Sequence, residues 1–236
     1  MISQPTFLPW LGWFDLVSIC DVVILLDTVQ FNKRSWQQRN RIRTKDGLEF
    51  ITVPVFTAGK SKQKIKDVMI SDKQFYDYFF RKIKTSYSKS NHYDAVINDI
   101  RNTLPYSVFS NHLVDLNNEF IYFIMRWFCI RKNIIKASEL DVNVGVRGEY
   151  LAMLCEAVGA NEYISTPGAH DYLCLDIFEF RNRNINVFIS DYQHPEYNQA
   201  YSPFIPFASS LDLIMNYGEN SNKIMKNSKR TINILV

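Results

Sequence analysis

Cysteine is scarce in this sequence, and its four cysteines, Cys20, Cys129, Cys155 and Cys174, lie far apart. No CxxC pair is present, and no Cys/His spacing resembles a zinc site. We therefore expect reduced thiols, no bound metal and a cytoplasmic location. A signal peptide is also lacking. The most apolar run, FIYFIMRWFCI, carries Arg126 and is too short to cross a bilayer, so no membrane insertion is expected.

Several common signatures are absent as well. The sequence contains no GxGxxG, Walker A, GxSxG or HExxH motif. These absences argue against a dinucleotide oxidoreductase, a P-loop enzyme, a serine hydrolase and a zincin. No signature of an NAD or PLP cofactor is present either, so the cofactor stays unassigned. The net charge of +3 compels neither a nucleic-acid nor a membrane role.

The hydrophobic pattern of the first half begins as a βαβ unit. MISQP reads as a short strand, residues 12–19 as a helix, and DVVILLD as a strand buried on both faces, as in a parallel sheet. LEFITVPV adds a further strand, and residues 57–67 read as a polar, basic surface loop. From about residue 72 to 136 three helices are expected, with Ser110 as the N-cap of the third.

The C-terminal part returns to an α/β pattern. A helix ending at Gly159 precedes the strand EYIST, and INVFISD is another strand. SSLDLIMNYG reads as a short helix that Ser209 or Ser210 caps and Gly218 ends. We expect one α/β domain over 1–236, with a mostly parallel, Rossmann-like sheet and an inserted or appended helical subdomain at about 72–136.

A basic segment, LLDTVQFNKRSWQQRNRIRTK, is the first candidate for chemistry. Asp27 stands where a parallel strand would end, which is where ligands of open α/β sheets bind. No acidic residue lies between Asp27 and Asp46. Arginines bind phosphate oxygens in pairs, and Trp36 can stack on a base or sugar. The segment therefore predicts a phosphate site, and the alternative is a solvated basic face. The polar, basic and aromatic residues concerned are Gln30, Lys33, Arg34, Trp36, Arg39, Asn40, Arg41 and Arg43.

Two later segments also combine polar and conformationally special residues. STPGAHDYL follows a strand directly, and His170 beside Asp171 is a candidate general acid or base. YQHPEYNQAYSPFIPF crowds His194, Tyr197 and Gln199 between prolines, which suits a preorganised site. The alternatives are a bystander histidine in the first segment and an ordered surface loop in the second.

These segments resemble the WbqC-like family of bacterial surface-polysaccharide proteins. The family pattern runs approximately QPxYxPWxGYF, DVxVxLDxVQFxKRSWQNRNRI and TVPV, and here the text is SQPTFLPWLGWFDL, DVVILLDTVQFNKRSWQQRNRI and ITVPV. Near the C-terminus, GANEYISTPGAHDYL and HPEYNQAYSPFIPFASSLDLIMNYG match two further family blocks. His170 departs from the pattern, because it stands where the family commonly has arginine or lysine.

The resemblance implies a role in O-antigen or related glycan synthesis. The activity it implies is transfer of a glycyl, other aminoacyl or acyl group onto the amino group of a nucleotide-linked amino sugar. Lys33, Arg34 and Arg39 would bind the diphosphate, and Trp36 or Trp10 the base. The base candidates for the attacking amine are His194, His170 and Asp27. The hydrogen-bond donor candidates are Gln4, Gln30, Asn40 and Gln199.

Alternatives of other classes stay open. The strand–turn–helix start also resembles nucleotidylyltransferase-type folds, so an ATP-dependent amide ligase fits, although the HxGH signature of that group is absent. A non-catalytic nucleotide-sugar or glycan-binding module fits too. Free glycine with ATP, glycyl-tRNA and a carrier-bound glycyl group are all compatible donors. The sequence specifies neither the sugar nor the oligomeric state.

The turn LPWLGWF lies between the first strand and the first helix. In an α/β sheet such a turn faces the ligand crevice. We expect Trp13 and Phe14 to pack the helix onto the sheet, and Gln4, Trp10 and Gly12 to line the site. Gly12 would permit close approach of a ligand to the backbone at the helix start.

Overall fold

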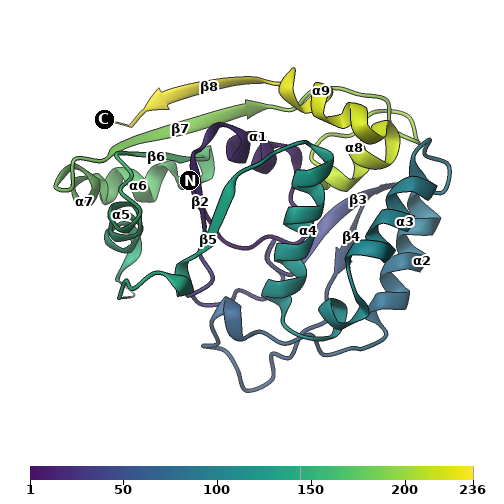
Figure 1. Ribbon diagram of the computed structural model, residues 1–236, viewed down its shortest axis with the longest axis horizontal. Coiled ribbons are helices and arrows are strands. Elements are labelled where there is room, and N and C mark those ends of the chain that lie inside the picture. The colour runs from purple at the N-terminus through teal and green to yellow at the C-terminus, as the bar shows by residue number, and fades with distance from the viewer. Residues whose placement is uncertain (144, 236) are drawn as a thin grey trace.

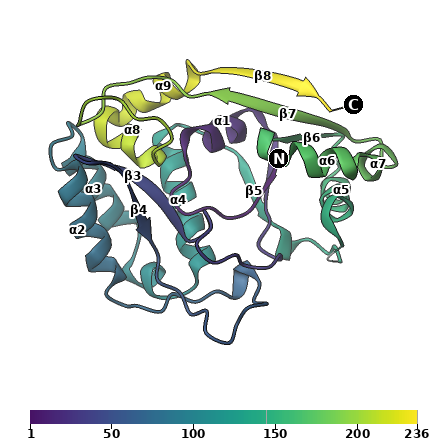
Figure 2. The same cartoon turned by 180° about the vertical axis from the view of Figure 1, so that it is seen from behind.

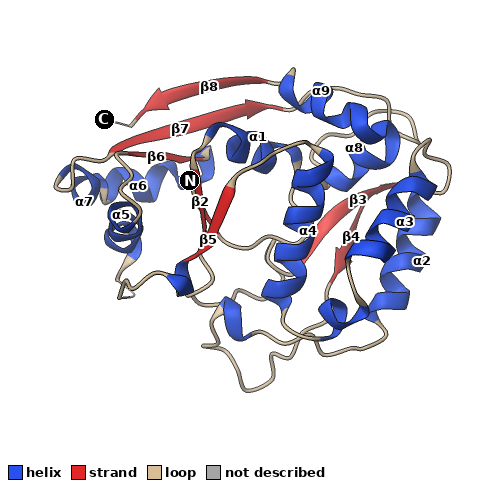
Figure 3. Ribbon diagram, viewed as in Figure 1, coloured by secondary structure: helices blue, strands red, loops and turns tan. Residues whose placement is uncertain are grey.

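The computed structural model describes residues 1–143 and 145–235. Within those ranges it contains three small sheets, which are red in Figure 3. The parallel sheet has the strand order β1 (Ile2–Ser3), β2 (Val22–Leu25), β5 (Asn133–Lys136). The second sheet is a hairpin of β3 (Arg39–Thr44) and β4 (Gly47–Thr52). The third sheet has the strand order β6 (Glu162–Ser165), β7 (Asn186–Gln193), β8 (Lys229–Ile234). The α-helices are α1 (Leu11–Ile19), α2 (Phe75–Tyr87), α3 (Tyr93–Thr103), α4 (Leu113–Trp127), α5 (Arg147–Ala157), α6 (His170–Leu175), α7 (Ile177–Arg181), α8 (Ser210–Tyr217) and α9 (Ser221–Lys226).

The strand β2 separates two hydrophobic cores. It lies in the middle of the parallel sheet, where Ile24 is opposite Ile2 of β1 and Ile135 of β5. Val23 and Leu25 pack in a core shared with α1, α2 and α4, whereas Ile24 packs in a second core with α5 and β7. Successive strand residues face opposite sides, so a strand between two cores needs apolar residues throughout. The predicted α/β fold and the prediction of a doubly buried strand at DVVILLD are confirmed.

The first helix joins the parallel sheet to the third sheet. Trp13 and Phe14 are buried on α1, as predicted, and Trp13 Nε1 donates to Ser3 Oγ over 2.9 Å. On another side of α1 the carboxylate of Asp15, only 1% exposed, accepts a 2.9 Å hydrogen bond from Arg230 Nε of β8. Figure 1 shows α1 lying beneath β7 and β8. The first helix and the last strand are therefore held together by an ion pair with one buried partner.

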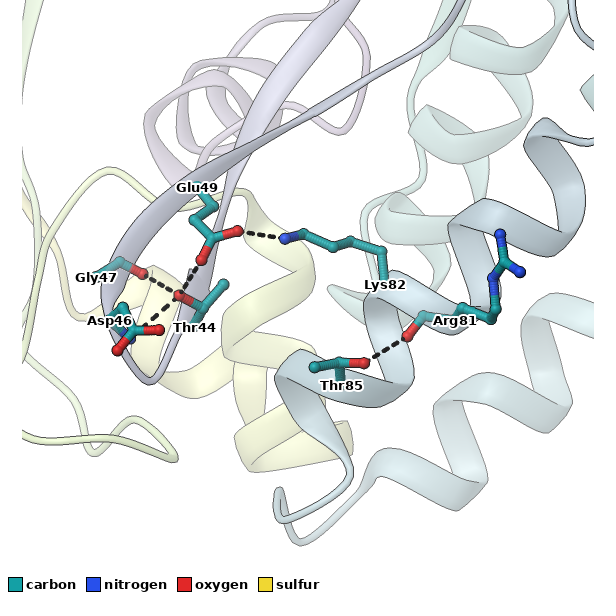
Figure 4. Close-up of polar contacts among 7 residues, drawn as sticks. All are labelled: Thr44, Asp46, Gly47, Glu49, Arg81, Lys82 and Thr85. Atoms are coloured by element: carbon teal, nitrogen blue, oxygen red, sulfur yellow. Dashed lines mark hydrogen bonds and ion pairs between the residues drawn. The ribbon is translucent and has the colours of Figure 1, made fainter.

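The hairpin β3–β4 is fastened to α2 through Glu49 of β4, which Thr44 of β3 also contacts (Figure 4). Thr44 Oγ1 donates to Gly47 O over 3.1 Å and to Glu49 over 3.0 Å. The Lys82 ammonium of α2 pairs with the other carboxylate oxygen of Glu49 and lowers the pKa of that carboxyl. Arg81, the neighbour of Lys82, points away from the hairpin. The turn itself uses Gly47 at a positive φ of 124°, which glycine adopts without strain.

The predicted helical region contains α2, α3 and α4, which cover the hairpin side of the molecule (Figures 1 and 2). Their shared core is strongly aromatic: Phe79 lies 5.5 Å from Phe109 and 5.3 Å from Phe120, ring centre to ring centre. The same region ends in β5, which pairs with β2 and so ties the helices to the parallel sheet. The division into one domain with a helical subdomain stays a prediction. No helix of the described residues is long and apolar enough to cross a membrane.

The predicted helix ends are partly right. Ser209 caps α8, accepting a 3.2 Å hydrogen bond from Leu211 N, and Gly218 follows its last residue, as predicted. The prediction for Ser110 is wrong: α4 begins at Leu113 after the N-cap residue His112, and Ser110 Oγ donates to a carbonyl within a preceding 3₁₀ turn.

Candidate functional site

A cleft of about 1020 Å³ opens at the carboxyl ends of β1, β2 and β6. Its other walls are the first turns of α5 and α6 and the loop 35–37. Figures 1 and 2 show β6, α5 and α6 beside the N-terminus, on the side of the molecule away from α2 and α3. Ligand sites of α/β proteins lie at such strand ends, and about 300–1,000 Å³ is typical of small-molecule pockets. This cleft is therefore the candidate functional site.

Gln4 and Trp36 are the two predicted site residues that line the cleft. The Oε1 of Gln4 accepts a 2.7 Å hydrogen bond from Gln37 Nε2. The Nε2 of Gln4 makes no hydrogen bond to another described residue, so this amide remains as a donor toward the cleft. Ser3, the preceding residue, also lines the cleft and accepts from Trp13. The strand end thus presents short, uncharged polar groups.

Tyrosine hydroxyls line the opposite wall. The hydroxyl oxygen of Tyr150, on α5, lies 2.8 Å from Thr28 Oγ1. This hydrogen bond ties the helix to the chain after β2. Tyr163 OH donates weakly to Ser165 Oγ at 3.5 Å. Burial raises the pKa of Tyr163 and, less strongly, that of Tyr172. These phenols are therefore neutral at pH 7 and act as hydrogen-bond donors or acceptors.

Arg147, the first residue of α5, is the cation among the cleft-lining residues of the described chain. The next residue, Gly148, donates its amide to Asp176 over 3.1 Å, and a Cβ at Gly148 would lie 2.3 Å from Asp176 Cβ. The first turn of α5 is therefore held against the start of α7. A guanidinium that lines a polar cleft suits a phosphate-bearing ligand.

His170 stands at the rim of the cleft. The neighbouring Asp171 lines the cleft, and its carboxylate lies 3.1 Å from His170 Nδ1. Cys174, one turn later on α6, has its sulfur 3.7 Å from His170 Nε2. Of the three predicted base candidates, His170 is thus the one next to the cleft.

The loop 32–38 brings the KRSW segment to the cleft. Gln37 and Gln38 are buried, and their Oε1 atoms accept from the backbone amides of Asn32 and Arg34 over 3.1 and 3.0 Å. These two amides hold the loop in shape, with Arg34 at a positive φ of 62°. Trp36 is half exposed and lines the cleft, and its role as a stacking residue stays a prediction.

Asp27 is placed away from the cleft lining. Its side chain is 1% exposed, and its two carboxylate oxygens accept from Ser138 N over 3.0 Å and Ser138 Oγ over 2.6 Å. Asp27 therefore joins the end of β2 to the turn after β5. A carboxylate with both oxygens hydrogen-bonded is a structural link in this state, and not a free base.

His194 lies with Trp10 in an aromatic cluster outside the cleft lining. Its ring stacks on Trp10 at 6.4 Å and lies 5.4 Å from Phe207. Nδ1 donates to Pro195 O over 2.8 Å, and burial lowers the pKa of the imidazole. Nε2 is buried without a hydrogen-bond partner in the described residues. His194 is thus neutral, but it faces aromatic rings and not the cleft.

Gly12 packs against the indole ring of Trp10 in the same aromatic cluster. A Cβ at Gly12 would lie 2.3 Å from Cη2 of Trp10, so the glycine makes room for the indole ring. Gly12 is buried beneath that ring. The predicted contact of Trp10 and Gly12 with a ligand therefore has no counterpart at this cleft.

Tyr197 and Gln199 belong to a buried polar network. Both donate to Asp212 Oδ2, over 2.8 and 2.9 Å. Gln199 Oε1 accepts a hydrogen bond from Arg43 Nε. The Arg43 residue is only 1% exposed, and its Nη2 donates to the carbonyl of Tyr201. Burial raises the pKa of Asp212 to about 6. This network holds the segment 197–212 against β3. The polar groups of Tyr197 and Gln199 therefore form hydrogen bonds within the fold.

The other predicted polar residues are also engaged. Asn40 is buried and donates to the carbonyls of Phe7 and Leu8 over 3.0 and 2.8 Å. Gln30 is exposed and donates to Ser61 O over 2.8 Å. Asn40 therefore supports the turn before α1, and Gln30 fixes a surface loop.

The predicted phosphate-binding cations lie on the surface. Lys33 and Arg34 are exposed at the tip of the loop 32–38. Arg39 lies over the ring of Phe50, 4.2 Å from its centre. None of these three lines the cleft.

Several cleft residues were not predicted: Ser3, Arg147, Tyr150, Tyr163 and Tyr172. Tyr172 belongs to the candidate segment STPGAHDYL, whereas the other four sit in segments that read as ordinary scaffold; the approach of β6 to β1 gathers them. The signal that was available is the run EYISTPG, a strand followed at once by a turn. No group of three or more His, Cys, Asp or Glu side chains in the described residues is arranged to hold a metal ion.

Comparisons with known proteins bear on the whole chain. The sequence profile of the WbqC-like protein family matches residues 4–224. "Uncharacterized protein Rv1507c" of Mycobacterium tuberculosis (strain ATCC 25618 / H37Rv) is 33% identical over 218 residues, which cover 92% of this chain and 93% of that protein. No solved structure matches the chain.

Proposed function

Because this chain belongs to the WbqC-like protein family, we propose that it is an N-aminoacyl or N-acyl transferase. The group transferred is glycyl or a similar small acyl group, and the acceptor is the amino group of a nucleotide-linked amino sugar. The product would serve O-antigen or related surface-polysaccharide synthesis.

The cleft at the ends of β1 and β6 carries this proposal. Its volume of about 1020 Å³ accommodates a nucleotide with an attached sugar. The Gln4 amide and the hydroxyls of Tyr150 and Tyr172 suit the many hydroxyls of a sugar, because neutral donors and acceptors pair with them without a desolvated charge. Arg147 suits the diphosphate, and Trp36 offers a ring on which the base can stack.

The proposed reaction is attack of the sugar amine on the carbonyl carbon of an activated acyl donor, an ester or a thioester. The nitrogen–carbon bond forms, and the bond from the carbonyl carbon to the donor's oxygen or sulfur breaks. His170, oriented by Asp171 at 3.1 Å, takes a proton from the amine and returns it to the departing atom. The Gln4 amide is the donor that would stabilise the oxyanion.

Binding is tested first, by thermal shift with uridine- and thymidine-diphosphate 4-amino sugars. Bound ligand stabilises the folded state by mass action, so the melting temperature should rise with ligand concentration. Arg147→Gln should weaken the affinity about tenfold or more, because it removes a charge-assisted contact to phosphate. Arg131→Gln removes a cation that is exposed and outside the cleft, and it should leave the affinity unchanged. No shift at millimolar ligand would contradict the proposal.

Turnover is tested by mass spectrometry of the sugar after incubation with the protein, glycine, ATP and a cell extract. A protein-dependent gain of one glycyl residue supports the transferase. A reaction that purified protein completes with only free glycine and ATP would instead identify an amide ligase. Tight binding with no turnover from any donor would identify a binding module.

A further inference from the structure

A basic face lies beside the cleft, on the part of the molecule formed by the loop 32–38, the hairpin and the loop 57–66. It comprises eight cations from two segments of the chain: Lys33, Arg34, Arg39, Arg41, Lys60, Lys62, Lys64 and Lys66. The proposed reaction uses none of these side chains. The face meets the cleft at Ser35 and Trp36, which belong to its loop and also line the cleft.

Backbone hydrogen bonds hold the two segments side by side. Phe31 N donates to Gln63 O over 2.9 Å, and Ile65 N donates to Val29 O over 3.0 Å. The side chain of Gln30 adds a 2.8 Å bond to Ser61 O. The basic loop 60–66 therefore lies along the chain that leads into the KRSW loop.

The lysines of the loop are exposed, whereas the residues between them point inward. Gln63 points inward, donating to Phe56 O over 2.9 Å, and Ile65 is fully buried. Lys62, Lys64 and Lys66 alternate with these two residues and are exposed. The segment consists of a turn at residues 61–62 and a 3₁₀ turn at Ile65–Asp67, and the three lysines lie on its outer side.

Aromatic rings are interleaved with these cations. Trp36, Phe50 and Phe56 are 50%, 43% and 50% exposed. Each has a cation over its ring: Arg41 at 5.5 Å from Trp36, Arg39 at 4.2 Å from Phe50, and Lys60 at 5.9 Å from Phe56. Trp36 and Phe50 are neighbours, with ring centres 6.0 Å apart.

The positive charge of the face is uncompensated. None of its eight cations forms an ion pair with a carboxylate in the described residues. Asp27, beside the loop in sequence, is buried and bonded to Ser138. Asp67 is the exposed acid that directly follows Lys66. An anionic partner would therefore meet this face with little competition from the protein's own carboxylates.

We propose that the basic face binds single-stranded RNA, namely the end of an aminoacylated RNA that serves as the acyl donor at the cleft. Proteins that bind single strands combine cations for the phosphates with exposed aromatic rings on which bases stack, and both are present here. The identity of the donor rests on the proposed function, whereas RNA binding itself does not.

The resulting step balances without ATP. The sugar amine attacks the carbonyl carbon of the ester that links the aminoacyl group to the terminal ribose. The carbon–nitrogen bond forms, the carbon–oxygen bond to the ribose breaks, and the ribose oxygen takes up the proton that the amine loses. Trp36, at the border of face and cleft, would guide the last nucleotides inward.

The test is fluorescence anisotropy of the full chain with a labelled single-stranded RNA ending in CCA, and with total tRNA, at several salt concentrations. The triple variant Lys62→Gln, Lys64→Gln and Lys66→Gln should bind about tenfold more weakly and reduce the slope of log K against log salt by about 2. The matched control is Lys223→Gln, Lys226→Gln and Lys229→Gln, which removes three exposed lysines of α9 and β8, across the molecule from the loop 57–66 (Figure 1). The control should bind as the unchanged protein does.

The aromatic rings are tested separately from charge. Trp36→Ala with Phe50→Ala should weaken RNA binding at least about fivefold, because base stacking on aromatic rings is lost. The control Phe178→Ala removes an equally exposed ring on α7 and should have no effect. Equal loss of binding in both lysine triples, or no loss in the double aromatic variant, would overturn the proposal.

Vesicle binding and ribonuclease treatment separate this inference from its alternatives. Binding to anionic phospholipid vesicles with none to RNA would assign the face to a membrane surface instead and overturn the proposal. Ribonuclease treatment of the donor extract should abolish glycyl transfer. Transfer that survives ribonuclease, in a protein that does not bind RNA, would overturn this inference and leave the proposed function standing. RNA binding with no transfer from any donor would sustain the RNA site and contradict the proposed function.

Discussion

Gln37 and Gln4 meet side chain to side chain, with Gln37 Nε2 donating to Gln4 Oε1 over 2.7 Å. Gln4 continues β1 at the base of the cleft, and Gln37 belongs to the loop that carries Trp36 into it. Gln37 is 2% exposed and also accepts from the backbone of Asn32. This contact joins the loop 32–38 to the strand end at the cleft, together with a 3.0 Å backbone bond from Phe7 N to Trp36 O.

Gln37→Leu should uncouple the loop from the strand. It leaves Asn32 N and Gln4 Oε1 without their partner. Because both bonds are only partly buried, the cost is about 1 kcal/mol, the lower end of the range for buried groups. We expect a loss of that size in the free energy of unfolding by urea, together with faster proteolysis within residues 32–38. Gln30→Ala is the control, because its bond to Ser61 is exposed. Equal stability of Gln37→Leu and the unchanged protein would show that the contact does not position the loop.

Ser138→Ala tests the structural role of Asp27. The hydroxyl of Ser138 donates 2.6 Å to Asp27 Oδ2, and its loss removes a hydrogen bond to a buried charge. We expect a loss of about 1.5–3 kcal/mol in unfolding free energy, with sugar-nucleotide affinity retained. If Ser138→Ala kept full stability but lost transfer activity, Asp27 would have to be assigned to the chemistry after all.

Asp212 should make stability fall as the pH rises. Burial raises its pKa from the ordinary 3.8 to about 6, so between these values the folded protein keeps a proton that the unfolded chain has released. Its stabilising contribution is complete below the unfolded pKa and is lost as the pH rises through the folded pKa, a change of about 3 kcal/mol. Asp212→Asn cannot titrate. Urea unfolding at several pH values should show the stability of the unchanged protein, relative to Asp212→Asn, declining by up to that amount from about pH 4 to 7. A constant or rising difference would contradict the raised pKa.

His194 should act in the opposite direction. Burial lowers its pKa below the ordinary 6.5, so on acidification the unfolded chain takes up a proton before the folded protein does. Its contribution to stability is present above pH 6.5 and is lost as the pH falls through the folded value. His194→Phe keeps a ring against Trp10 but cannot titrate, so it should gain stability relative to the unchanged protein as the pH falls from about 7 to 5. Parallel pH profiles for the two proteins in thermal unfolding would refute this.

Gly12→Ala should destabilise the protein, although alanine in a helix interior is normally about 1 kcal/mol more favourable than glycine. The new methyl would lie 2.3 Å from the Trp10 ring, and such overpacking typically costs about 1–3 kcal/mol. The double variant Gly12→Ala, Trp10→Ala relieves the clash, so the two effects should not add in urea unfolding. A stabilised single variant would show that Trp10 moves freely.

The elements that could be predicted are those whose pattern is local. The run VVILL between Asp21 and Asp27 predicts β2 because all five of its residues are apolar. Ser209 predicts the start of α8 because capping depends on neighbouring residues. The strand β3 escapes prediction because its polar residues Asn40 and Arg43 are buried through side-chain bonds to distant carbonyls. β5 is only four residues long, and β8 is mostly exposed, so neither has a strong apolar pattern.

The site was predictable only where a motif residue happens to reach the cleft, as Gln4 and Trp36 do. Tyr197 and Gln199 were predicted because polar residues between prolines are typical of a preorganised site. The same pattern is required of a buried network, and here the partners are Arg43 and Asp212, which lie far away in sequence. Sequence spacing cannot separate these two uses, since both need polar groups on a stiff backbone.

The ion pair between Asp15 and Arg230 bears on how the chain is made. The two residues are 215 positions apart, so during synthesis α1 emerges long before its partner strand exists. Until β8 has been synthesised, Asp15 lacks its ion-pair partner Arg230, and α1 cannot pack against β8. Contacts of such long sequence separation slow folding and leave apolar surface exposed meanwhile. The packing of α1 against β8 can therefore form only after both ends of the chain have been synthesised.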